Sequence, residues 1–278
     1  MLFQFSERGT IAALVLIFVL VQGVGLYVGS QYSAYIQAGV LKPIVDEPAN
    51  PASAGILFLY ILGVTALILL VIRFVKNLLV VIEGMAVFFT SWLTFDFIYP
   101  LEIGWVSLGF FLALALTAWK IWRPTILSQN VALIFSIAGA GGVLGASLDV
   151  FPVLLFMLLL SVYDFVSVFI TKHMVYMAKA ITEKPMAFTA AVPCKTRKYV
   201  HVFQLGGGDM VIPLMFSVSL LTAYGPKIAL ASLAGALIAL IILIRHVMKS
   251  PGRALPALPP VCAGAVTGFA LGYFLLGV

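Results

Sequence analysis

Nine apolar runs follow one another along this chain, and each is close to the length that a helix needs to cross a membrane. A helix rises 1.5 Å per residue, so about 20 apolar residues span the hydrocarbon core. The runs are separated by short segments with charges, prolines, asparagines or glycines. We predict spans at residues 9–29, 54–72, 78–95, 103–119, 126–145, 150–171, 200–222, 227–244 and 256–277.

Composition agrees with this prediction, because 63% of the 278 residues are hydrophobic and only 9% are charged. A soluble domain carries about 25% charged residues. The first run lacks a clear small-residue cleavage site, so we predict a spanning helix there and no cleaved signal peptide. We therefore expect an all-α, multi-pass membrane protein with a single polytopic domain, residues 1–278, in contact with the lipid bilayer.

The basic residues predict the orientation of the nine spans, since cytoplasmic loops carry an excess of Lys and Arg. With the N-terminus in the cytoplasm and the C-terminus outside, 14 of the 16 Lys and Arg residues lie inside. Only Lys42 and Lys227 then lie outside. The net charge of +6 thus reports topology, and we predict no nucleic-acid partner.

Few side chains inside the predicted spans can do chemistry. Cys194 and Cys262 lie far apart, so neither a disulfide framework nor a metal cluster is indicated, and we predict no metal and no other cofactor. Glu83 follows Lys76 by seven residues, and we interpret it as an interfacial or pore-facing acid that is partly hydrated. Asp164 and Asp209 have apolar sequence on both sides, where a charge is costly unless a function holds it.

Asp164 and Asp209 are predicted to lie at similar depth. Asp164 precedes Lys172 by eight residues in the sixth span, and Asp209 follows Lys198 by eleven in the seventh. On consecutive antiparallel helices, these spacings place Asp164 roughly 12 Å and Asp209 roughly 16 Å from the cytoplasmic side of the membrane. Two close carboxylates cannot both ionise cheaply, so we expect them to share a proton. Such a pair can activate water as aspartic proteases do, but the spacing also fits a hydrogen bond across a helix interface or a transport role.

Asp209 lies in the stretch Leu-Gly-Gly-Gly-Asp-Met-Val-Ile-Pro, residues 205–213. The three glycines remove side chains beside the acid, which lets another backbone or a substrate come close. Pro213 cannot donate to the carbonyl of Asp209, so that carbonyl needs water or another polar partner. A glycine run in a membrane helix is more often a packing surface, but the acid directly after this run favours an active site.

The ninth span opens with Arg-Ala-Leu-Pro-Ala-Leu-Pro-Pro-Val, residues 253–261. Its three prolines are expected to prevent a regular first turn and to expose backbone on the side where the two aspartates lie. Further along, Gly264, Gly268 and Gly272 recur every four residues, which predicts tight helix packing.

Three motifs together resemble the intramembrane aspartyl proteases of the presenilin and signal peptide peptidase group: Y-D, then G-x-G-D, then P-A-L. They match in order, spacing and topology, on spans six, seven and nine. The resemblance covers residues 150–278, the expected catalytic helices, and leaves 1–149 as scaffold helices. It implies a catalytic pair (Asp164 and Asp209), residues that shape the site (Tyr163, Gly206, Gly207 and Gly208) and residues that position the site and the substrate (Pro256, Ala257 and Leu258).

Orientation and sequence detail favour the presenilin branch of this group. Presenilins have the N-terminus inside and the C-terminus outside, and Pro-Ala-Leu-Pro at 256–259 looks closer to presenilin. The chain departs from the group at Gly207, where a leucine is usual, and lacks the long insertion of eukaryotic presenilins between spans six and seven. It looks like a compact microbial homologue in a prokaryotic-type plasma membrane, expected to act without obligatory partner subunits; a homo-oligomer stays open.

The resemblance also implies the substrate class, which is single-span membrane proteins. Their helices must unwind locally before cleavage, because a helix hides its peptide carbonyls. The segment Met-Ala-Phe-Thr-Ala-Ala-Val, residues 186–192, could offer a strand edge to an unwound segment. An unstructured linker is our first interpretation of these residues.

Two other classes of protein would use the same acids. A secondary transporter or ion channel could relay protons or bind cations at Asp164 and Asp209, since broken helices and midplane acids occur there as well. That class is expected to have a second broken helix in a related half of the chain, and the sequence offers none. A prepilin-type peptidase also has G-x-G-D, typically with Lys two residues after the aspartate, where this chain has Val211.

Overall fold

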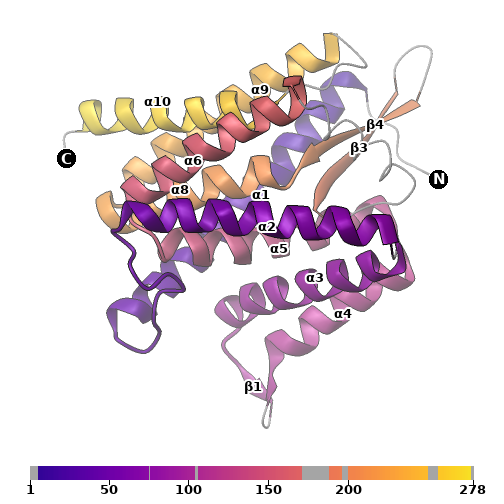
Figure 1. Cartoon of the computed structure of the whole chain (residues 1–278), viewed down its shortest axis with the longest axis horizontal. Helices are drawn as coiled ribbons and strands as arrows, with labels where there is room; N and C mark the ends of the chain where they lie inside the picture. The colour runs from indigo at the N-terminus through magenta and orange to yellow at the C-terminus, as the bar shows by residue number, and fades with distance from the viewer. Residues whose placement is uncertain are drawn as a thin grey trace.

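The protein is a bundle of helices with a β-hairpin at one end (Figure 1). The computed structural model describes residues 6–74, 76–103, 106–170, 188–195, 200–249 and 256–276. The helices of these ranges are α1 (Glu7–Gln37), α2 (Pro51–Phe74), α3 (Lys76–Ile98), α4 (Leu108–Trp122), α5 (Ile126–Ala146), α6 (Val150–Phe165), the π-helix η1 (Val166–Ile170), α8 (Gly208–Tyr224), α9 (Pro226–Lys249) and α10 (Leu258–Leu276). Two antiparallel hairpins pair β1 (Glu102–Ile103) with β2 (Val106–Ser107), and β3 (Thr189–Lys195) with β4 (Val200–Gly206).

Each predicted apolar run overlaps one of these α-helices. Six helical stretches among the described residues are long and apolar enough to cross a membrane: α1, α5, α6 together with η1, and the described parts of α3, α9 and α10. The apolar helices α4 and α8, and the described part of α2, are shorter. The break predicted between the fifth and sixth runs is present, since α5 ends at Ala146 and α6 begins at Val150. The helical membrane-protein class is thus confirmed, with hairpins added to it.

The prediction of one continuous helix over residues 200–222 is wrong at its start. Residues Val200–Gly206 form β4, and helix α8 begins only at Gly208. A short apolar run cannot be assigned to helix or strand from periodicity alone, and pairing with β3 decides the outcome here. Asp209 therefore lies in the first turn of a helix, where we had predicted an interior position.

Helix α8 lies at the centre of the bundle, in contact with α1, α5, α6, α9 and α10. All but one of the residues from Met210 to Leu220 are buried. Close packing against α5 requires glycine at one position, because a β-carbon at Gly145 would lie 2.6 Å from the carbonyl oxygen of Met215. The centre of the core is thus the helix that begins at Asp209.

The small-residue stripe of α10 packs against α9, as predicted. A β-carbon at Gly264 would lie 2.5 Å from the carbonyl oxygen of Gly235 on α9. Figure 1 shows this helix pair on one side of α8, and α3 with α4 on the opposite side of the molecule. The end of α6 and the hairpin β3–β4 lie at the same end of the bundle.

Candidate active site

Asp209 is held in the first turn of α8, immediately after the hairpin. The free N–H groups and the dipole of a helix N-terminus favour a carboxylate there. The carboxylate lies against Gly206, since a β-carbon at that glycine would be 3.2 Å from Oδ2. The buried Gln22 of α1 donates from Nε2 to the carbonyl oxygen of Met210, 2.9 Å away, and so fixes the same turn from another helix. The turn that carries Asp209 is thus fixed by the hairpin that precedes it and by the bond from Gln22 of α1.

Asp164 lies near the end of α6, where the helix changes to the π-helix η1. Single π turns within α-helices often occur at functional sites. The hydroxyl of Ser167 in η1 donates to the carbonyl oxygen of Asp164, at 2.9 Å. The carboxylate oxygen Oδ2 of Asp164 accepts the backbone N–H of Leu258, at 3.2 Å. Helix α10 therefore orients the acid that α6 carries.

The proline-rich start of α10 explains this bond. Pro256 and Ala257 are not helical, as predicted, but Pro259 and Pro260 belong to a regular first turn, so the prediction of an irregular turn is wrong there. Proline fits a first turn because the N–H groups there have no helical partner. Since Pro259 and Pro260 have no N–H, and that of Val261 bonds to Ala257, the N–H of Leu258 is the free donor of this turn. It points to Asp164.

The two aspartates lie within electrostatic range of each other. Cys262, which sequence reasoning set aside, belongs to the same cluster: it is buried and within electrostatic range of both acids. It follows Leu258 by four residues and so shares its face of α10. This four-residue spacing from the P-A-L motif is visible in the sequence and could have indicated that Cys262 lies near the acids.

Tyr163 and the glycines take different places around this pair. The ring of Tyr163 packs edge-on against Phe58 of α2, with 6.2 Å between centroids, so it ties α6 to α2. Gly207 is buried, and its N–H donates to the carbonyl oxygen of Phe188 at 2.7 Å. A β-carbon there would lie 2.8 Å from that oxygen and 2.9 Å from Cδ1 of Ile137, whereas nothing lies within 4 Å of one at Gly208. The atypical glycine is therefore the tightly packed one.

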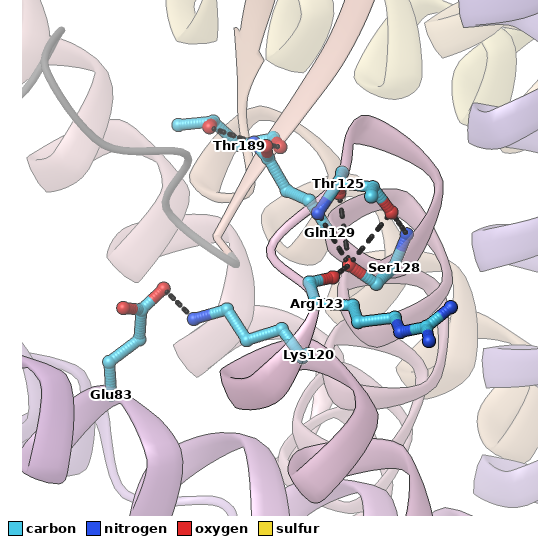
Figure 2. A network of polar contacts seen from close by, with 7 residues as sticks. All are labelled: Glu83, Lys120, Arg123, Thr125, Ser128, Gln129 and Thr189. Atoms are coloured by element: carbon cyan, nitrogen blue, oxygen red, sulfur yellow. Dashed lines mark hydrogen bonds and ion pairs between the residues drawn. The ribbon is translucent and has the colours of Figure 1, made fainter.

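The hairpin before Asp209 replaces part of the expected linker. Residues 186 and 187 lie outside the described ranges, but Thr189–Val192 belong to β3, so the linker interpretation is wrong for them. The strand that the edge hypothesis requires is present, and its use by a substrate stays a prediction. Two amides at the start of α5 hold β3. Gln129 donates to the carbonyl oxygen of Thr189 at 2.6 Å and to its hydroxyl at 2.8 Å (Figure 2). Asn130 bonds both backbone groups of Ala191, at 2.8 and 2.9 Å.

Glu83 forms an ion pair with Lys120 between α3 and α4, which corrects its predicted hydration (Figure 2). The two side chains are only 8% and 7% exposed. Figure 2 shows the pair beside the turn from α4 to α5, where Thr125 and Ser128 cap the helix that carries Gln129. The predicted span ended at residue 119 and so left Lys120 in the loop that follows, because a cross-helix pair leaves no pattern in either segment.

The sequence model of one protein family, described as signal-peptide peptidase, presenilin aspartyl protease, matches residues 14–278. The chain belongs to this family. Two solved structures titled as a presenilin family intramembrane aspartate protease have the same fold. One, in a C222 crystal form, is 24% identical with a TM-score of 0.70 over 95% of this chain and 99% of that one. The other, in a P2 form, is 25% identical with a TM-score of 0.67 over 94% and 96%.

A comparison with curated proteins finds no match. The two acids are compatible with three classes of protein: an intramembrane aspartyl protease, a transporter or channel, and a prepilin-type peptidase. Membership of the presenilin and signal-peptide peptidase family decides between them. The protein is an intramembrane aspartyl protease, and neither the transporter or channel nor the prepilin-type peptidase is supported.

Proposed function

We propose that Asp164 and Asp209 are the catalytic pair and that they cleave peptide bonds within the membrane-spanning segments of other proteins. The observation that carries this proposal is their convergence: acids from two helices lie within electrostatic range beside the hairpin and the start of α10. Neighbouring carboxylates of this kind share one proton, which leaves one acid as base and the other as acid.

The bond from Leu258 supports the orientation of the Asp164 carboxyl group. Its N–H occupies one lone pair on Oδ2 of Asp164. The remaining lone pairs of the carboxyl group can share the proton with Asp209 and hold the attacking water. Leu258 acts through its backbone, and Pro256 and Ala257 bring that backbone to the site.

The reaction needs only this pair and one water molecule. The ionised carboxylate takes a proton from the water while its oxygen attacks the peptide carbonyl carbon, and the protonated carboxyl group donates to the carbonyl oxygen. When the C–N bond breaks, the leaving nitrogen takes a proton from one carboxyl group, and a hydroxyl of the tetrahedral intermediate returns a proton to the other carboxylate as the new carboxylic acid forms. The dyad ends with one shared proton, as it began.

The hairpin supports a binding mode for an unwound substrate. Ala191 turns both backbone groups toward Asn130 and therefore away from β4. In an antiparallel pair, the residue opposite such a position also turns its groups outward. Its partner Gln204, and Val202 and Gly206 in alternation, thus point to the outer edge of β4. We propose that the substrate adds as a strand to this edge, which leads directly to Asp209.

We also propose that the chain crosses a prokaryotic-type plasma membrane nine times, with its N-terminus in the cytoplasm and its C-terminus outside. The charge distribution supports this orientation, since 14 of the 16 Lys and Arg residues then lie inside. A cysteine added after Val278 should react with an impermeant maleimide applied from outside to whole cells. Reaction only after permeabilisation would contradict the orientation.

The catalytic proposal is tested with purified protein in detergent and a single-span model substrate. Asp164→Ala and Asp209→Ala should each lower cleavage by about 10²- to 10⁴-fold, because each removes a proton-transfer group. Asp149→Ala, at the exposed opposite end of α6, is the matched control and should cleave as wild type does. Cleavage by either active-site variant at the wild-type rate would show that the pair is not catalytic.

A further inference from the structure

Gln129 and Asn130 form a clamp on β3, which we call the amide clamp. The two residues are consecutive in the first turns of α5, and their partners, Thr189 and Ala191, are alternate residues of the strand. Asn130 gives Ala191 one acceptor and one donor, which is what a residue of a neighbouring strand would give. The amide clamp therefore takes the place of a third strand on the β3 side of the hairpin.

The amide clamp fixes the register of the hairpin relative to α5. Ala191 is 2% exposed, so its backbone groups have little access to water when these bonds are lost. A strand that slips by one residue would turn Ala191 away from Asn130 and reverse the faces of all its side chains. Two side chains on one rigid helix thus permit one position of β3.

The register of β3 affects the position of Asp209, because only a few residues connect the two. Thr189 pairs with Gly206 at the end of the hairpin, and the next residue, Gly207, donates to Phe188. Asp209 follows two residues later. A shift of β3 along α5 would therefore move the outer edge of β4 relative to the acid.

We propose that Gln129 and Asn130 are positioning residues that determine which peptide bond of the substrate is cut. They close the β3 edge, so that a strand can add only at β4, and they fix how far that edge extends toward Asp209. This inference rests on the proposed catalytic pair and on strand addition at β4. A purely structural role would also require the bonds, but it would affect stability and leave the cleavage position unchanged.

The test compares the cleavage sites of wild type and Asn130→Leu on one single-span substrate, by mass spectrometry of both products. Leucine keeps the approximate size of asparagine and removes both bonds to Ala191. We expect the share of product from the principal bond to fall by about twofold or more, with new products cut one or two residues away, because strand register moves in whole residues. Gln37→Leu, an exposed amide on the last turn of α1, is the matched control and should keep the wild-type pattern.

An unchanged product pattern in folded Asn130→Leu would overturn the inference, whatever the change in stability. If that variant does not fold, Gln129→Leu and Asn130→Asp are judged by the same criterion, since each leaves part of the amide clamp in place. Asp209→Ala in the same assay separates the two proposals. If Asp209→Ala is inactive and the clamp variants keep the wild-type cleavage sites, only the role of the amide clamp is contradicted. If Asp209→Ala is active, the catalytic pair is contradicted as well.

Discussion

The two aspartates lie on helices with opposite surroundings. Helix α8 is buried along most of its length and is held by α1, α5, α9 and α10 around it. Helix α6 exposes several large side chains and ends in a π-helix, and its contacts near Asp164 include the ring of Phe58 and the backbone N–H of Leu258. From this difference we expect Asp209 to be the fixed member of the pair. We expect Asp164 to be the member whose position adjusts when substrate arrives.

The largest effect is expected where α8 is fixed most tightly. Gly145→Val would place a branched side chain within 2.6 Å of the carbonyl oxygen of Met215, and backbone cannot move aside as a side chain can. Overpacking costs about 1–3 kcal/mol or more, and this backbone contact should reach the upper end. We expect little folded, active protein, measured by size-exclusion chromatography and thermal melting. Gly23→Val, on the same bundle with nothing within 4 Å, is the control. Normal melting of Gly145→Val would show that α8 is not fixed.

A smaller effect is expected at the turn that carries Asp209. A β-carbon in Gly207→Ala would lie 2.8 Å from the carbonyl oxygen of Phe188, so the hairpin and α8 must separate slightly. We expect a loss of about 1–3 kcal/mol in the free energy of unfolding, together with reduced cleavage. Gly208→Ala should leave stability unchanged, because its β-carbon meets nothing. Equal melting temperatures for the two variants would remove the distinction between these glycines.

The smallest effect is expected on the α6 side. Phe58→Leu removes the edge-on ring contact with Tyr163, and such contacts contribute about 0.5–1.5 kcal/mol. If α6 adjusts, this change should lower cleavage by roughly twofold to tenfold and hardly alter the melting temperature. Phe151→Leu, at an exposed position of α6, is the control. A fall in melting temperature as large as that of Gly207→Ala would contradict the contrast between the two helices.

Sequence reasoning located most of the bundle and the two acids, for a physical reason. Membrane helices must satisfy their backbone internally and face lipid, so each leaves a long apolar run in the sequence. The helix that carries Asp164 followed from one such apolar run. The position of Asp209 was right in outline only, because Val200–Gly206 are apolar enough to be interpreted as helix and form a strand instead.

The contacts that support the site could not be predicted in the same way. Gln129 and Thr189 are 60 residues apart, and a side chain that bonds a distant backbone changes no periodicity in either segment. The pairing of Glu83 with Lys120 has the same character, since each residue alone is also compatible with a hydrated helix end. Such contacts depend on how helices are placed next to one another, which local patterns do not record.

The backbone bond from Leu258 to Asp164 has a consequence for how this enzyme tolerates mutation. A main-chain N–H is present whatever the side chain, so every substitution at Leu258 except proline retains the donor. Ala257 contributes a further backbone bond to Asp164. Pro259 and Pro260, in contrast, have no N–H, and replacing either would add a competing donor. The genetic constraint on this contact therefore falls on the residues that make no bond to the acid.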